Sequence, residues 1–270
     1  DEKQCNDFIG GYGIGANILF EQQKAGVDPL GHDAMLGFVT GPLTGTPALI
    51  GSRYTVVGKS PLTGTWGDAN SGGDFGPHLK FAGYDAVFFK GISELPVYLN
   101  IENGKAVLRD ADHLWGKDTS ETEAILQSGQ GKTARVACIG TAGENLSLIS
   151  CIMNNKGRAA GRSGLGAVMG SKMLKAITVN GNLKVPIAYP AELKGARRRY
   201  LHQMKEAVIF LMINSGGTAG LMEFLHLTGE APCKNWGGAA TVDFADIEPL
   251  LGPAVDKLTE KRYGCWHCPI

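Results

Sequence analysis

The sequence predicts an α+β protein in which a β-rich region precedes a helical one. Short apolar runs such as MLGFVTG, RYTVVG and AVFFKG lie between glycines in the first part of the chain and are typical of buried strands. From Pro190 onward the apolar residues follow a helical period instead. Strands followed by helices favour the α+β class over an alternating parallel sheet. We expect the boundary near Pro186.

Local signals predict the individual elements in order. Residues 15–25 predict a short helix that ends at Gly26. The pair Asn103-Gly104 predicts a tight hairpin, because both positions tolerate a positive φ. A helix is expected to begin at Thr119 and run to Gln127, with Asp118 or Thr119 as its N-cap. Strands are expected over residues 35–40, 53–58, 86–90, 96–101, 105–109, 134–139, 147–152 and 174–180.

Charge and hydropathy exclude several classes of protein. The 270 residues carry 26 basic and 26 acidic side chains, so the chain has no global attraction for nucleic acid. No apolar run approaches the roughly 20 residues of a membrane span, and no signal peptide is visible. We therefore expect a cytoplasmic protein without a membrane span. The chain begins without methionine and ends two residues after a cysteine pair, which indicates a fragment.

Glycine is the anomaly of the composition. There are 39 glycines, of which 30 lie in the first 181 residues, about twice the usual share of ~7%. They are interpreted either as the turns of a ligand-free β domain or as backbone that approaches a large phosphate-bearing ligand. The runs Gly11–Gly15 and Gly161–Gly166 do not have the spacing of a dinucleotide-binding motif, which argues against a Rossmann site.

Two stretches combine arginine with small residues. Arg158 and Arg162 lie in the run from Lys156 to Lys172, just before a short helix whose N-terminus would favour an anion. The second stretch is residues 68–73, with Arg53 upstream of it. A guanidinium group suits phosphate and carboxylate, so both stretches are candidates for anion binding. The alternative is that these arginines are ordinary surface charges.

Cys265 and Cys268 form a C-x-x-C pair followed by proline. This spacing occurs in zinc sites, iron–sulfur sites and redox dithiols. The chain has no second pair for zinc and no βαβ context for a dithiol, so an iron–sulfur site completed beyond Ile270 fits best. The remaining cysteines are expected to be small apolar or incidental thiols, and the six histidines show no metal-ligand spacing; they are Cys5, Cys138, Cys151, Cys233, His32, His78, His113, His202, His226 and His267.

Several of these segments together resemble one family. They are GPLTGTPA, RYTVVGKSPLTGT, ANSGGDFGPHLKFAGYDA, HLWGKDTSETE, IGTAGENL, IMNNKGRAAGRSGLGAVMGSKMLKAI and CWHCPI. The chain resembles the tungsten-containing aldehyde ferredoxin oxidoreductases, almost continuously over residues 8–186. The resemblance implies that residues 1–186 are a pterin-cofactor-binding β base, built from two sheets related by a pseudo-two-fold axis with short helices, whose first strands are missing. Residues 187–270 would begin an α-helical domain that carries the first half of an iron–sulfur site.

The resemblance also implies a function. In this family an aldehyde and water give a carboxylic acid, and the electrons pass from a tungsten bis-pterin centre through a [4Fe–4S] cluster to ferredoxin. Molybdenum is left open as the metal, and a homo-oligomer is a further expectation. The acid/base residues are expected beyond residue 270, so this chain alone should be inactive. The alternatives are the active-site subunit of a tungsten-dependent benzoyl-CoA-type reductase and a non-catalytic electron-transfer paralogue.

Residue roles follow from the matched motifs. The resemblance places Arg53 between pterin and cluster, and it assigns cofactor contacts to Gly72, Arg158, Gly161 and Arg162. It assigns to Asn70 and Ala159 the backbone carbonyls that hold a magnesium ion between the pterin phosphates. It makes Cys265 and Cys268 the first two ligands of the [4Fe–4S] cluster.

Overall fold

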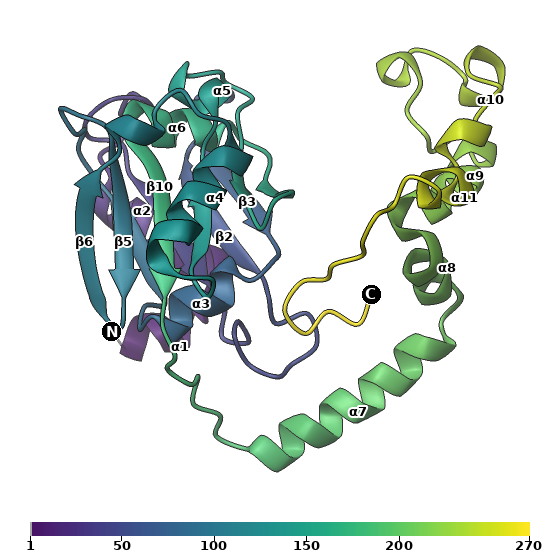
Figure 1. Ribbon diagram of the computed structural model, residues 1–270, viewed down its shortest axis with the longest axis horizontal. Coiled ribbons are helices and arrows are strands. Elements are labelled where there is room, and N and C mark those ends of the chain that lie inside the picture. The colour runs from purple at the N-terminus through teal and green to yellow at the C-terminus, as the bar shows by residue number, and fades with distance from the viewer. Residues whose placement is uncertain (1) are drawn as a thin grey trace. The chain divides into compact units, whose positions relative to one another are not determined.

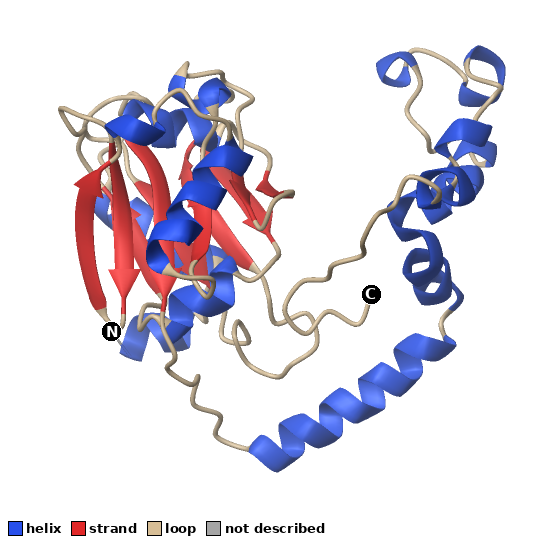
Figure 2. Ribbon diagram, viewed as in Figure 1, coloured by secondary structure: helices blue, strands red, loops and turns tan. Residues whose placement is uncertain are grey.

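The computed structural model describes residues 2–270, which form two compact units. The first unit is the chain up to Ala188 together with Cys265–His267, and the second is Tyr189–Gly264 together with Cys268–Ile270. The described strands all belong to the first unit, whereas the second unit is helical (Figure 2). The predicted α+β class, with a β-rich base before a helical segment, is confirmed.

The first sheet of the base is antiparallel, with strand order β3-β2-β1-β4. Its strands are β1 (Leu36–Thr40), β2 (Tyr54–Lys59), β3 (Trp66–Ser71) and β4 (Ala86–Phe89). The central strand β1 is buried along its whole length, and Phe38 lies opposite Val56 and Val87. β3 therefore forms one free edge of this sheet.

The second sheet has the order β6-β5-β10-β7-β8-β9, in which only the β5–β10 pair is parallel. Its strands are β5 (Val97–Glu102), β6 (Lys105–Asp110), β7 (Arg135–Cys138), β8 (Ile152–Asn154), β9 (Arg158–Ala160) and β10 (Leu174–Asn180). The predicted hairpin joins β5 to β6, with φ of 46° at Asn103 and 81° at Gly104. β9 forms the free edge at the other end of the sheet.

The helices of this unit are short. They are α1 (Glu2–Phe8), α2 (Tyr12–Gln22), α3 (Phe75–Phe81), α4 (Thr119–Gln130), α5 (Thr141–Glu144), α6 (Leu165–Ser171) and the 3-10 turn η1 (Asp112–Leu114). α4 begins with a capping box, in which the Asp118 carboxylate accepts the Glu121 amide at 2.8 Å and Glu121 accepts the Asp118 amide at 3.3 Å. Asp118 is therefore the N-cap among the two predicted candidates.

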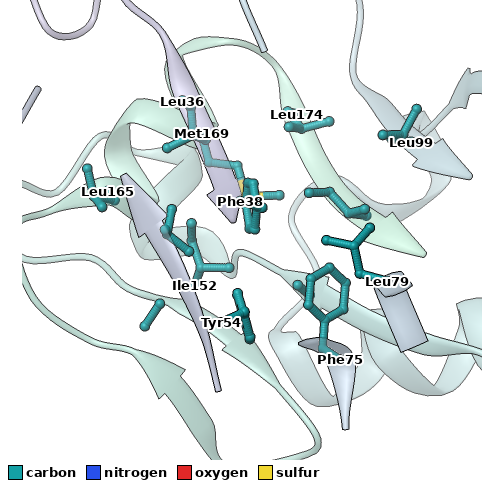
Figure 3. Packing of buried hydrophobic residues seen from close by; sticks show 14 of the residues in the cluster. Leu36, Phe38, Tyr54, Phe75, Leu79, Leu99, Ile152, Leu165, Met169 and Leu174 are labelled. Carbon is teal, nitrogen blue, oxygen red and sulfur yellow. The ribbon is translucent and has the colours of Figure 1, made fainter. Parts of the chain in front are cut away.

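The core lies between the two sheets, where α3 and α6 also contribute side chains. Figure 3 shows Phe38 and Tyr54 of the first sheet close to Phe75 of α3 and Ile152 of the second sheet. Each sheet is covered on its other face by one helix. α2 packs Leu19 against the first sheet, and α4 packs Leu126 against the second (Figure 1). The layer order is thus α2, first sheet, core, second sheet and α4.

The structure differs from the sequence predictions at several elements of this unit. The helix predicted over residues 15–25 lies at Tyr12–Gln22. Residues 147–151 form a turn and irregular backbone, and the strand begins only at Ile152, because Leu146 adopts a left-handed φ of 56° and Ser150 bonds locally to Ser147. β3 was not expected, because its sequence WGDANS is polar and lacks an apolar run. Its alternating burial shows that small residues rather than large apolar ones face the core there.

The second unit contains α7 (Pro190–Glu206), α8 (Val208–Gly216), α9 (Met222–Leu227), α10 (Ala240–Asp243) and α11 (Gly252–Asp256), with 3-10 turns η2 (Gly217–Leu221), η3 (Lys234–Trp236) and η4 (Glu248–Leu250). One apolar segment does reach membrane-spanning length, contrary to the sequence prediction. Residues Val208–Leu227 are 20 residues with a mean hydropathy of 1.4, enough by length and composition alone. In the structure this segment is divided among α8, η2 and α9, with a left-handed φ of 61° at Gly217.

Candidate functional site

The free edges of the two sheets meet at β3 and β9, which lie against each other. The Ser163 hydroxyl, just after β9, donates to the Asp68 carbonyl of β3 at 3.0 Å. This contact joins segments that are 95 residues apart in sequence. Four predicted site residues are thereby brought to one place: Asn70, Gly72, Arg158 and Ala159.

Backbone oxygens are available as metal donors at this junction. An edge strand leaves part of its N–H and C=O groups without a strand partner. The Asn70 side chain is directed to β2, where its amide donates to the Thr55 hydroxyl at 3.3 Å. Magnesium prefers oxygen ligands, so the backbone carbonyls of Asn70 and Ala159 are suitable donors for the predicted ion.

Arg53 lies beside the same edge. It lines a pocket of about 310 Å³ together with Asn70 and the turns around Gly10, Pro42 and Gly51. Arg53 is exposed, and within residues 2–270 no carboxylate forms an ion pair with Arg53 or Arg162. Their charges therefore remain available to a phosphate. A larger pocket of about 810 Å³ opens between α2 and the β2–β3 turn, but none of the predicted site residues lines it.

The side chains of Arg53 and Cys265 both lie close to the Gly72 backbone. A Cβ at Gly72 would lie 2.9 Å from the Cys265 Sγ and 3.1 Å from the Arg53 Nη1. Any side chain at this position would displace one of the two groups. The absence of a side chain at Gly72 therefore allows a guanidinium and a thiol to approach the same stretch of backbone.

The segment around Cys265 is held against the base by Trp266. The Trp266 amide donates to the Gly73 carbonyl at 3.3 Å, and the indole N–H donates to the Thr46 carbonyl at 3.2 Å. Its ring meets Phe81 edge-on at a centroid distance of 5.3 Å. The Ile50 amide donates to the His267 carbonyl at 3.2 Å. Cys265 belongs to the first unit, whereas Cys268 belongs to the second.

Gly161 and Arg162 are exposed after β9, but the helix that follows does not offer its N-terminus to an anion. The first turn of α6 is buried, and the Gly166 amide donates to the Ser150 carbonyl at 3.2 Å. The expectation of an anion at this helix end is therefore wrong. The arginine side chains remain the candidates for anion binding.

The surroundings of the other cysteines and the histidines vary. Among residues 2–270 no group of three or more His, Cys, Asp or Glu side chains is arranged to hold a metal ion. Burial raises the pKa of Cys138 to about 12, which keeps this residue a neutral thiol. Burial also lowers the pKa of His78, whose Nδ1 lies 2.9 Å from the Asp74 carbonyl. Both side chains are therefore kept neutral by burial.

Three residues at the site were not found from the sequence. Trp266 docks the cysteine segment, while Tyr54 and Asn154 form a buried hydrogen bond of 3.1 Å beneath Gly72. Tyr54 follows Arg53 directly, and Asn154 begins the NNKGRAAGR run, so their proximity to candidate residues was the only signal available. A buried asparagine cannot be distinguished from a turn asparagine without the tertiary contacts.

Comparisons with known proteins identify relatives of the chain. The family model described as the N-terminal domain of aldehyde ferredoxin oxidoreductase matches residues 1–181. The chain is 44% identical over 272 residues to a tungsten-containing aldehyde ferredoxin oxidoreductase of Pyrococcus furiosus, covering all of this chain and 45% of that relative. It is 42% identical over 272 residues to a protein of the same name from Thermococcus kodakarensis, covering all of this chain and 44% of the relative.

A solved structure is also similar. The active-site complex BamBC of benzoyl coenzyme A reductase matches with a TM-score of 0.84 and 31% identity, over all of this chain and 43% of that one. The chain thus spans less than half the length of the proteins it matches. With a family model that covers its whole β base and relatives that align along its full length, the chain belongs to the aldehyde ferredoxin oxidoreductase family.

Proposed function

We propose that the full protein oxidises aldehydes to carboxylic acids. The observation that carries the proposal is the junction of β3 and β9 beside Arg53 and Cys265. The aldehyde and one water become the acid, two protons and two electrons. When bound, a tungsten bis-pterin would supply the redox chemistry, and a [4Fe–4S] cluster held by this chain's cysteines would connect it to ferredoxin. Relatives at 40–44% identity carry the corresponding name.

The chain's own residues bind and orient these groups. Arg53, Arg158 and Arg162 provide positive charge and planar donors for phosphate. Gly72 and Gly161 leave the backbone open to the cofactor. The backbone carbonyls of Asn70 and Ala159 would supply oxygen ligands for a magnesium ion. Cys265 and Cys268 provide two cluster thiolates.

Different parts of the chain have different roles in this proposal. Residues 1–186 are the cofactor-binding base, and residues 187–270 begin a helical domain that carries the first cluster ligands. The acid/base residues and most of the aldehyde pocket lie beyond residue 270. The protein is cytoplasmic and delivers electrons to ferredoxin, with molybdenum as the alternative metal.

The decisive experiment is metal analysis and dye reduction with the full-length protein from anaerobic expression. Tungsten with iron, together with aldehyde-dependent dye reduction, supports the proposal. Iron without tungsten or molybdenum indicates a non-catalytic electron-transfer paralogue and contradicts it.

Two substitutions test the residue roles. Cys265→Ala should abolish the EPR signal of the reduced cluster, and an unchanged signal refutes the ligand assignment. Arg162→Glu should lower tungsten content, because it places a carboxylate opposite a phosphate. The matched control is Arg109→Glu on β6, an exposed arginine at the opposite edge of the same sheet. Equal tungsten content in the two variants would count against a phosphate role for Arg162.

A second candidate is reduction of an aromatic acyl-CoA, which the BamBC similarity favours. The two functions differ in substrate and in the direction of electron flow. Dye reduction by an aldehyde with no response to benzoyl-CoA supports the first, and oxidation of a reduced donor by benzoyl-CoA supports the second.

A further inference from the structure

We infer that Asn154 is a positioning residue that holds the Gly72–Gly73 backbone, and through it the relative position of Arg53 and Cys265. Asn154 lies at the end of β8 in the second sheet and is 1% exposed. The backbone it holds follows β3 in the first sheet. The assignment rests on the proposed function in so far as Cys265 is a cluster ligand, but the contacts themselves do not depend on it.

The Asn154 side chain uses all of its hydrogen-bonding capacity. Its Oδ1 accepts the hydroxyls of Ser71 at 2.8 Å and Tyr54 at 3.1 Å. Its Nδ2 donates to the Gly72 carbonyl at 2.9 Å and to Asn155 Oδ1 at 3.0 Å. An amide has two acceptor sites and two donors. The orientation of the amide is unambiguous, because the Gly72 carbonyl can only accept.

The groups around Asn154 have fixed donor and acceptor roles. Burial raises the pKa of Tyr54 far above its ordinary value, so its hydroxyl stays protonated and donates. Asn155 Oδ1 also accepts the Asp74 amide at 2.8 Å, which holds the residue after Gly73. The two asparagines therefore bond to the backbone on both sides of Gly73.

Gly73 has no room for a side chain on this network. Its φ is 85°, and a Cβ there would lie 2.5 Å from Asn155 Oδ1 and 2.7 Å from Asn154 Nδ2. The Gly73 carbonyl accepts the Trp266 amide. A two-residue stretch is thus held by Asn154 and Asn155 on one side, and contacts Arg53, Cys265 and Trp266 on the other.

The four hydrogen bonds of Asn154 differ in what they hold. Loss of the Asn154 bond to Gly72 frees the backbone against which both the guanidinium and the thiol lie. Loss of the hydroxyl bonds on Oδ1 leaves that bond in place. The network therefore has one half that bonds the Gly72 backbone directly and one half that bonds the side chains of Tyr54 and Ser71.

The experiment uses the full-length protein and reads hydrogen exchange of the Trp266 amide by mass spectrometry. Asn154→Leu has similar volume and removes all four bonds, and Gly73→Ala pushes the asparagines away if Asn154→Leu does not fold. The control for Asn154→Leu is Tyr54→Phe combined with Ser71→Ala, which spares the Gly72 bond. The control for Gly73→Ala is Gly64→Ala, which has a φ of 71° but no neighbour within 4 Å of its Cβ.

We expect several-fold faster exchange at Trp266 in the two test variants and little change in the controls. The iron-loaded protein should also show altered EPR g-values in the test variants alone. Unchanged exchange in both test variants, or equally fast exchange in the controls, overturns the assignment. If the wild-type protein contains neither tungsten nor iron, the proposed function fails, while the exchange comparison still decides the role of Asn154.

Discussion

The ion pair between Lys175 and Glu144 gives a sharp test of what stabilises the first unit. The Lys175 side chain on β10 is fully buried, and that of Glu144 at the end of α5 is 5% exposed. Lys175 also donates to the Lys117 carbonyl at 2.8 Å, and Glu144 accepts the Gly116 amide at 2.9 Å. The pair thus joins β10, α5 and the turn before α4.

Lys175→Met leaves the Glu144 carboxylate buried without its counter-charge and the Lys117 carbonyl without this donor. Removal of one partner of a buried pair costs about 3–5 kcal/mol. Adding Glu144→Gln to this variant removes the unpaired charge but keeps an acceptor for the Gly116 amide. We therefore expect the double variant to recover more than half of the lost free energy of unfolding.

The assay is urea denaturation followed by tryptophan fluorescence, to which the half-buried Trp115 next to Gly116 contributes. Lys105→Met, at an exposed position on β6, is the control and should change stability by no more than about 0.5 kcal/mol. A loss of less than about 1 kcal/mol in Lys175→Met would refute the reasoning. The same holds if the double variant is no more stable than the single one.

Three further predictions concern stability. Burial lowers the pKa of Lys172 from 10.5 to about 8, so between these pH values the unfolded state binds more protons and the free energy of unfolding should rise with pH. The urea midpoint of wild type, measured relative to Lys172→Met, should therefore increase from about pH 8 to pH 9.5. A constant difference between the two midpoints would contradict the lowered pKa. Gly104→Ala should destabilise by about 1 kcal/mol through its φ of 81° alone, whereas Gly129→Ala in α4 should stabilise by a few tenths; thermal melts that shift in the same direction would refute this. Asp118→Ala should cost about 1 kcal/mol through loss of the capping box, measured by urea titration against Ser120→Ala.

Much of the fold could be predicted because its signals are local. The Asn103-Gly104 hairpin and the Asp118 cap depend on residues within a few positions of each other. β1 and β10 have apolar runs that a buried strand requires. β3 could not be predicted, since its small and polar residues face a neighbour that lies far away in sequence.

The candidate site was predictable only as a set of residue types. Arginines among glycines and a C-x-x-C pair indicate anion and cluster chemistry, but they do not give a geometry. The approach of Cys265 to Gly72 and Arg53 joins segments about 200 positions apart in the sequence. The same is true of Asn154, whose partners Tyr54 and Ser71 lie 100 and 83 residues away.

The sequence by itself determined the fold class, the family resemblance and the chemical character of the candidate residues, because these depend on composition, spacing and local turn chemistry. Only the tertiary structure decided that the two sheets meet at β3 and β9, and that Trp266 docks beside Gly73. It also decided that the first turn of α6 is buried, with the Gly166 amide bonded to the Ser150 carbonyl. The physical reason is that burial and hydrogen-bond partners are properties of distant segments packed together, which no local pattern in the chain records.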